Sequence, residues 1–111
     1  MSPKEFAQLF YNEKEDILKI YFESDNTAEV SIKIAELNLE SEQVDKLKNI
    51  IDCVITDTMY TILLGLDGCA SIGGIQNDYK LYDENGHLLA GDCGELEAAA
   101  YEVFHENNDI T

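Results

Sequence analysis

Apolar residues recur at helical spacing in the first twenty residues of the chain. Phe6, Leu9 and Phe10 occupy positions i, i+3 and i+4, and the same apolar stripe resumes over residues 17–21. A repeat near 3.6 residues places such side chains on one face of a helix. The pattern predicts a helix over residues 3–22.

Residues around this segment supply a start signal and one competing interpretation. Ser2 and Glu5 have the spacing of a capping box, and Pro3 suits the first helical position. The competing interpretation ends the helix near Glu13 and makes residues 17–23 a strand, because apolar residues there also alternate. The sequence leaves both open.

The next segment alternates strictly. Val30, Ile32 and Ile34 are separated by single small or polar residues, after a turn-forming cluster at residues 24–27. Alternation of this kind is typical of a half-buried strand. A strand is therefore expected over residues 28–36.

A long apolar repeat with helical period occupies the middle of the chain. It predicts a helix over residues 42–65, capped by Ser41 and ended by Gly65 and Gly68. We expect this helix to be the spine of the core. The residues expected to face the sheet are Ile51, Val54, Ile55 and Ile62.

Two further elements are predicted in the last third. Asn85-Gly86 lies between the apolar segments 77–82 and 88–90, and Asn-Gly is a strong hairpin signal because both residues tolerate positive φ. A final helix is expected over residues 94–106, with Asp92 and Glu95 as a second capping box.

This order of elements predicts a single α+β domain over residues 1–111. A small, mostly antiparallel sheet, made of the strand and the hairpin, would pack against about three helices.

Charge narrows the possible partners. The chain has 23 acidic residues against seven bases, all of them lysines, for a net charge of −16. Nucleic-acid backbones need Lys or Arg to displace counterions, so nucleic-acid binding is not expected. A basic protein partner fits this charge, since opposite charge accelerates encounter. The alternative is that the acids only keep the protein soluble.

Cysteines and hydropathy bear on location. Cys53, Cys69 and Cys93 are widely spaced, so we expect them to be reduced in a cytoplasmic protein. Uninterrupted apolar runs such as residues 62–64 are too short to span a bilayer, and the first residues lack the apolar run expected of a signal peptide. No membrane partner is expected, and the oligomeric state is left open.

No catalytic, cofactor-binding or metal-binding residue is predicted. The glycine-rich stretch Gly65–Gly74 lacks a phosphate-loop pattern and a nearby lysine. Asp83, Asn85 and His87 lack the glycine and glutamate that an EF-hand loop requires. Histidines and cysteines do not have the close spacing of a zinc site.

Tyrosines lie among acidic residues in the second half of the chain, a combination that suits protein interfaces. Alternatively, these rings cover the core with their hydroxyls at the surface. The residues we predict to contact a partner are Tyr82, Asp83, Glu84, Glu97, Glu102 and Glu106.

The last half of the chain contains the run Asp57–Gly68 and the Tyr-x-Leu-Tyr-Asp-Glu-x-Gly motif at Tyr79–Gly86, followed by an acidic helix at Glu95–His105. These segments resemble small, acidic bacterial proteins, some of them immunity proteins that accompany polymorphic toxins. The resemblance covers about the last half of the chain. It implies a bacterial cytoplasmic protein that neutralises a toxin by binding it.

Two functions from different classes follow. The first is a non-enzymatic acidic domain that binds a protein, such as an immunity-type inhibitor of a basic toxin or nuclease. The second is a small ligand-binding or enzymatic domain with its site near the Gly65–Gly74 loop. Convergence of polar groups on one pocket would favour the second.

Overall fold

The computed structural model describes residues 1–23, 27–92 and 94–106. Four α-helices, a short π-helical turn and one two-stranded sheet make up this part of the chain. In order they are α1 (Pro3–Glu23), α2 (Glu29–Glu36), α3 (Ser41–Leu66), β1 (Leu81–Tyr82), β2 (Leu88–Ala90), α4 (Glu95–Tyr101) and η1 (Glu102–Glu106).

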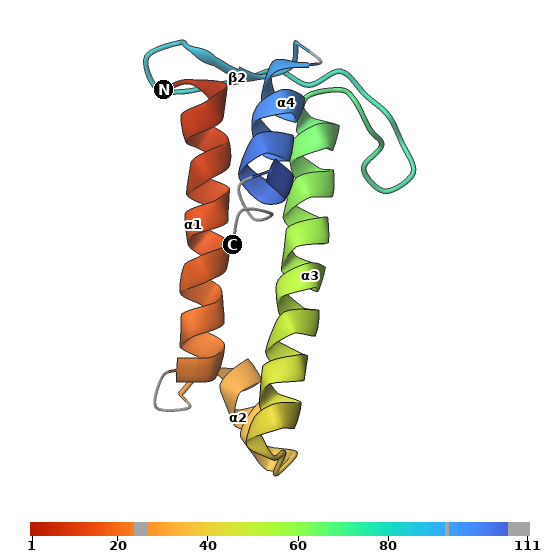
Figure 1. Cartoon of the computed structure of the whole chain (residues 1–111). Coiled ribbons are helices and arrows are strands. Elements are labelled where there is room, and N and C mark those ends of the chain that lie inside the picture. Colours follow the sequence, from red (N-terminus) through yellow and green to blue (C-terminus); the bar gives the residue numbers. More distant parts are fainter. Residues whose placement is uncertain (24–26, 93, 107–111) are drawn as a thin grey trace.

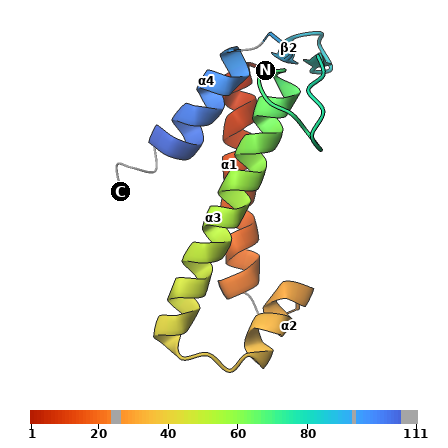
Figure 2. The same cartoon turned by 90° about the vertical axis from the view of Figure 1, so that its right-hand side faces the viewer.

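Helices α1 and α3 form a long antiparallel pair that sets the shape of the molecule (Figure 1). Helix α2 connects them at one end, and the β1–β2 hairpin lies across the other (Figures 1 and 2). Helix α4 packs on one side of the pair, in the half next to the hairpin. The protein is elongated, with extents of 46 × 30 × 27 Å.

The core lies where α4 and η1 meet α1, α3 and the hairpin. Most of its side chains are small or medium aliphatics, and Phe104 is its largest apolar member. The buried cluster consists of Ala7, Leu63, Ala90, Leu96, Ala99, Ala100, Val103 and Phe104. The far half of the α1–α3 pair contributes one fully buried apolar residue, Leu18.

The first helix is confirmed and extends to Glu23, so residues 17–23 are helical. Its capping box forms as predicted. The backbone N–H of Glu5 donates to Ser2 Oγ at 3.1 Å, and the backbone N–H of Ser2 donates to Glu5 Oε1 at 3.1 Å. These bonds lower the pKa of Glu5 from its usual range, with the bond from the Ser2 backbone the largest cause.

The strand predicted over residues 28–36 is wrong, because Glu29–Glu36 forms helix α2. Among the described residues the only strands are those of the hairpin, which lies at the opposite end. A strand without a neighbour would leave its backbone groups unpaired, whereas a helix satisfies them locally. Ser31, 1% exposed, anchors the helix by donating its hydroxyl to Ile20 O at 2.9 Å.

Helix α3 is confirmed, but its predicted inner face is wrong, because none of the four residues expected to face the sheet belongs to the buried core. Ile51 and Ile55 are half-buried, whereas Val54 is 57% exposed and Ile62 is 40% exposed. The helix is apolar on more than one side, so periodicity alone does not identify the inner face. Leu63 is the fully buried residue that marks it.

The cap of α3 also differs from the prediction by one residue. Glu40, not Ser41, is the N-cap, and its side chain accepts the backbone N–H of Gln43. In return Gln43 Oε1 accepts the backbone N–H of Glu40 at 3.0 Å. This is a capping box with a glutamate in the position usually held by a shorter side chain.

Among the described residues, α3 is the one helix whose length and apolar composition would allow it to cross a membrane. The core helix of a soluble protein can pass the same test. Here only 17% of the apolar window is buried within the chain. A large part of its apolar surface therefore faces outward.

The predicted hairpin is confirmed, with shorter strands than expected. Leu81 pairs with Ala90 and Tyr82 with Leu88, in antiparallel register. Gly86 adopts φ 83°, but Asn85 does not have positive φ, and the Gly86 N–H donates to Asp83 O at 3.1 Å. The turn is therefore built on residues 83–86 with a glycine at its end, and not on Asn85-Gly86 as its two central residues. The chain is thus an α+β domain, mostly helical, with a sheet of two strands.

Candidate functional site: an aromatic and acidic surface on α3 and α4

The position of α4 depends on one buried carboxylate, Asp67, at the C-terminal end of α3. The residue is 1% exposed. Its Oδ1 accepts the backbone N–H of Gly91 at 3.0 Å, and its Oδ2 accepts those of Gly94 and Glu97 at 2.9 and 3.0 Å. Three long-range bonds therefore tie the end of α3 to the start of α4.

The capping box predicted at Asp92 and Glu95 does not form. Gly94 is the N-cap of α4 and has no side-chain cap. Asp67 satisfies the free N–H groups of the first turn instead, from a residue 27 to 30 positions away. Asp92 pairs with Lys80 at 3.6 Å on the surface. Sequence reasoning missed Asp67 because its partners are distant in the chain.

The last helix continues from α4 into the π-helical turn η1, and His105 lies at its end. The His105 ring contacts the Tyr60 ring of α3 edge-on, with centroids 4.6 Å apart, and lies 5.4 Å from the Tyr101 ring. Three aromatic rings thus line the boundary between α3 and the last helix. Tyr101 is 49% exposed and forms the outer edge of this cluster.

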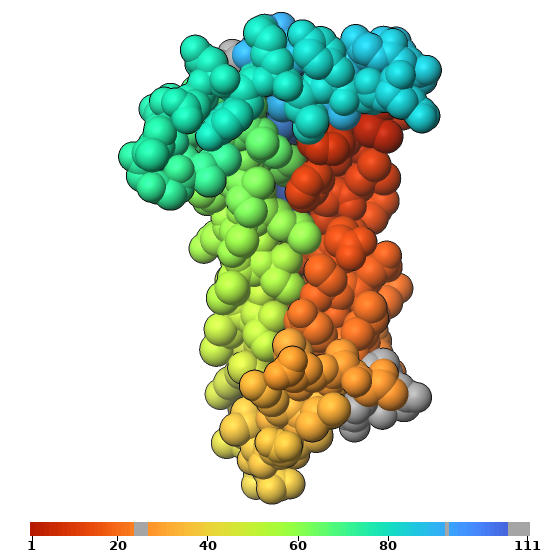
Figure 3. All heavy atoms as spheres, turned by 180° about the vertical axis from the view of Figure 1, so that it is seen from behind, coloured from red at the N-terminus to blue at the C-terminus, as the bar shows by residue number. Residues whose placement is uncertain are grey.

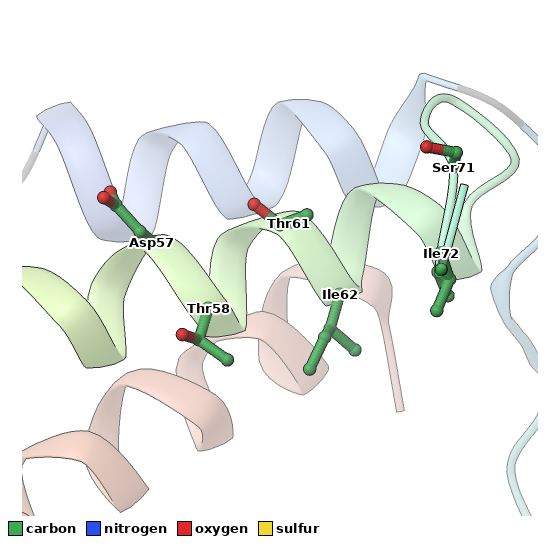
Figure 4. A pocket seen from close by; sticks show the side chains of 7 residues that line it. Asp57, Thr58, Thr61, Ile62, Ser71 and Ile72 are labelled. Carbon is green, nitrogen blue, oxygen red and sulfur yellow. The ribbon is translucent and has the colours of Figure 1, made fainter.

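Glu97 of α4 lies close to Tyr60. Burial raises the pKa of Tyr60, and the nearby charge of Glu97 and the Tyr101 hydroxyl raise it further. Asp57 and Thr61 project from α3 towards α4 (Figure 4). We call Asp57, Tyr60, Glu97, Tyr101 and His105 the aromatic–acidic surface.

Of the hairpin residues predicted to contact a partner, two are exposed and one is bonded within the protein. Tyr82 is 53% exposed and Glu84 is exposed. The Asp83 carboxylate instead holds the turn together. It pairs with the Met1 amine at 2.8 Å, lies 3.0 Å from His87 Nδ1 and accepts the backbone N–H groups of Asn85 and His87. The bond from the Met1 amine is the largest cause that holds the pKa of Asp83 well below its usual range.

The three glutamates predicted to line the last helix do not share one face. Glu97 lies on the side of α4 near Tyr60 of α3. Glu102 turns to the other side, where it pairs with Lys4 of α1 at 2.9 Å. Glu106 is exposed at the end of η1. Of the six predicted residues, the structure brings Glu97 into the aromatic–acidic surface and leaves the others outside it.

A pocket lies beside the glycine-rich loop, as a ligand-binding or enzymatic function at Gly65–Gly74 would need. It has a volume of about 420 Å³ and is open to solvent. Side chains of α3 and of the loop line it: Asp57, Thr58, Thr61, Ile62, Ser71 and Ile72 (Figure 4), with Gly73. Ile72 packs directly against Gly65, at a position where a Cβ on Gly65 would overlap its side chain. Hydroxyls and one carboxylate are the polar groups of this pocket.

One buried lysine, Lys14, lies in the middle of the helix pair. It is 1% exposed, pairs with Asp52 at 2.8 Å and donates to Thr56 Oγ1 at 3.2 Å. Its ammonium also lies 4.6 Å from the centroid of the Tyr11 ring. These contacts compensate the burial of its charge, so we assign Lys14 a structural role. Over the described residues, no group of three or more His, Cys, Asp or Glu side chains could hold a metal ion.

The expectation of reduced cysteines is wrong for Cys69, which is disulfide-bonded. Cys53 is free and exposed on α3. Cys93 lies outside the described residues.

We expect alkylation to distinguish these two thiols. In the folded protein without reductant, iodoacetamide should modify Cys53 because it is free and exposed, and should spare Cys69 because its sulfur carries no proton. After reduction and unfolding, both should react. Peptide mass mapping measures this, and rapid modification of Cys69 before reduction would contradict the disulfide.

Comparison with protein-family models, with curated proteins and with solved structures finds no match.

Proposed function

We propose that the protein is a non-enzymatic binding domain whose partner is a basic protein, held at the aromatic–acidic surface. The observation that carries the proposal is the grouping of Tyr60 and Tyr101 with Glu97 beside them, across two helices tied together by Asp67. A rigid support matters because ordering a mobile surface on binding costs free energy.

Each kind of group in this surface has a separate task. Tyrosine rings contribute large contact area at low cost in conformational entropy, and they are frequent among residues that dominate binding. Carboxylates beside them would pair with Lys or Arg of the partner. After Lys48 the sequence has twelve acidic residues and one lysine, so this end of the chain also attracts cations over a longer range.

Inhibition of a basic toxin or nuclease is the specific form of this function that we favour. Such enzymes need a basic surface to hold nucleic acid, and an acidic protein can occupy that surface. The resemblance to immunity-type proteins supports the same form and a cytoplasmic location. The disulfide of Cys69 weighs against that location, because disulfides rarely persist in a reducing cytosol.

The proposal is tested by measuring how fast this protein associates with the protein encoded by the gene next to its own. The association rate should fall steeply as ionic strength rises, because the Debye length shortens to about 10 Å at 0.1 M salt. Dissociation should change less. Glu97→Lys should slow association, and Tyr101→Ala should accelerate dissociation, because one removes steering charge and the other an aromatic anchor.

Glu36→Lys is the matched control, since it makes the same charge change on exposed α2 at the other end of the molecule. A rate that is indifferent to salt, or equal losses from Glu36→Lys and Glu97→Lys, would contradict the proposed surface. Circular dichroism of each variant verifies that the fold is retained.

A ligand site in the pocket at Gly65–Gly74 is the second candidate, favoured by the volume of about 420 Å³ beside that loop. Thr61→Trp would fill this pocket from an exposed position of α3. If a small molecule stabilises the protein against heat and this variant abolishes the effect, the ligand-binding function gains support over the proposal above.

A further inference from the structure

Helix α3 carries on its outer side an exposed ridge of uncharged residues, three of them apolar. Ile50, Val54, Thr58 and Ile62 are spaced by four residues, so they form one continuous row along the helix. Ile50 is 60% exposed, Val54 57% and Ile62 40%. We call these four residues the outer ridge. Figure 3 shows the molecule from the side opposite α4, where α1 and α3 lie next to each other with no helix over them in the part of the chain that is described.

An apolar pocket of about 300 Å³ lies between α1 and α3. It is lined by Phe6, Leu9, Phe10 and Glu13 of α1 and by Met59 of α3. Leu9 is itself 50% exposed. Its size suits an apolar side chain from another helix.

The outer ridge is free of charge, although the protein carries −16. Residues 50–62 include two acids, and both point elsewhere. Asp52 pairs with the buried Lys14 at 2.8 Å, and Asp57 projects towards α4 (Figure 4). The four side chains of the ridge therefore offer a basic partner no carboxylate, and Asp57 borders the ridge only at the loop pocket that it lines with Thr58 and Ile62. An uncharged apolar ridge is complementary to another uncharged apolar ridge.

The exposed area of the chain is larger than a monomer of this mass normally has. Its surface is 7197 Å², against about 6,200 Å² for a compact monomer of 12.5 kDa. The radius of gyration is 16.3 Å, against about 13 Å for a compact domain of this length. The difference of about 1,000 Å² belongs to the whole elongated chain, and it is large enough to supply the roughly 800 Å² that each partner buries in a standard interface.

We propose that the outer ridge is the interface of a homodimer, in which α3 of one copy packs against α3 of a second copy. A two-fold axis brings the same ridge of each copy together, and rows spaced by four residues interdigitate in the commonest mode of helix packing. An apolar side chain of the second copy would enter the pocket beside α1. The ridge itself carries no acid, and Glu13 is the one carboxylate that lines the pocket. Most of the repulsion between the copies therefore comes from acids outside the contact, where it is screened by salt.

Sedimentation equilibrium of the full chain tests the dimer. The expected mass is about twice the 12.5 kDa of one chain across the micromolar range. Raising the salt concentration should strengthen the dimer, because it screens repulsion between two acidic chains and favours apolar burial. The binding of a basic partner should weaken under the same change, so the two proposals succeed or fail separately.

Val54→Asp should convert the dimer to a monomer, with at least a hundredfold rise in the dissociation constant, because it buries an unpaired charge at the centre of the ridge. Ile75→Asp is the matched control, since Ile75 is 62% exposed on the loop between α3 and the hairpin. Unchanged far-UV circular dichroism in both variants shows that the monomer remains folded.

Three results would overturn the proposal. One is a wild-type chain that stays monomeric up to near-millimolar concentration and high salt. The second is a dimer that survives Val54→Asp. The third is a monomer that floats with neutral phosphatidylcholine vesicles and loses this property in Val54→Asp, which would identify the ridge as a lipid-facing surface.

Discussion

Replacing Asp67 by asparagine is expected to lower the free energy of unfolding by about 3–5 kcal/mol, since a buried charged acceptor would lose partners that no other group can supply. Its two oxygens accept the backbone N–H groups of Gly91, Gly94 and Glu97. Asparagine keeps one acceptor oxygen, and its amide would turn donors towards N–H groups that are themselves donors. Urea denaturation measures the loss.

Asp57→Asn is the control, because it makes the same chemical change on the same helix at an exposed position. It should alter stability by less than about 0.5 kcal/mol. If Asp67→Asn is equally mild, the link between α3 and α4 does not depend on this carboxylate. The aromatic–acidic surface would then need another support.

Gly91→Ala should cost about 2–4 kcal/mol, for two independent reasons. Gly91 has φ 125°, which a residue with a Cβ rarely adopts. An added Cβ would also overlap the carbonyl oxygen of Tyr79 and lie 3.0 Å from Lys80 Cα, and both are backbone atoms that cannot move aside. Thermal or urea unfolding measures the effect.

Gly74→Ala separates these two reasons. Gly74 also has positive φ, at 82°, but its added Cβ would meet nothing within 4 Å. It should cost about 1 kcal/mol, from backbone strain alone. Equal losses at the two glycines would mean that the close approach of β2 to the Tyr79–Lys80 segment contributes little.

Both large effects concern the same junction. Gly91 donates its N–H to Asp67 and lies directly after β2, so the hairpin and the start of α4 are held by one carboxylate. Loss of this junction should therefore also weaken a partner bound at the aromatic–acidic surface. The outer ridge of α3 lies away from the junction and should be less affected.

Local signals in the sequence determined the elements that satisfy themselves locally. The Ser2–Glu5 capping box forms between neighbouring residues, and the hairpin turn depends on the positive φ of its own Gly86. Such features need no information from distant parts of the chain, so they were predictable. The long helix α3 was predictable for the same reason, since its apolar repeat extends over many turns.

Tertiary structure decided what depends on a neighbour. Residues 28–36 alternate like a strand, but the described chain offers no strand beside them, so α2 satisfies its backbone internally. The inner face of α3 was ambiguous because the helix is apolar on several sides, and only packing against α1 and α4 selected Leu63 over Val54.

The candidate site was the least accessible to sequence reasoning. Acidity and tyrosines indicated a basic protein partner, and that remains a proposal. Which residues share a surface depended on the placement of α4, which turns Glu97 towards Tyr60 and Glu102 towards Lys4. That placement follows from Asp67, whose partners are 24 to 30 residues away in the chain. A contact over such a distance leaves no periodic or local pattern, so only the folded chain revealed it.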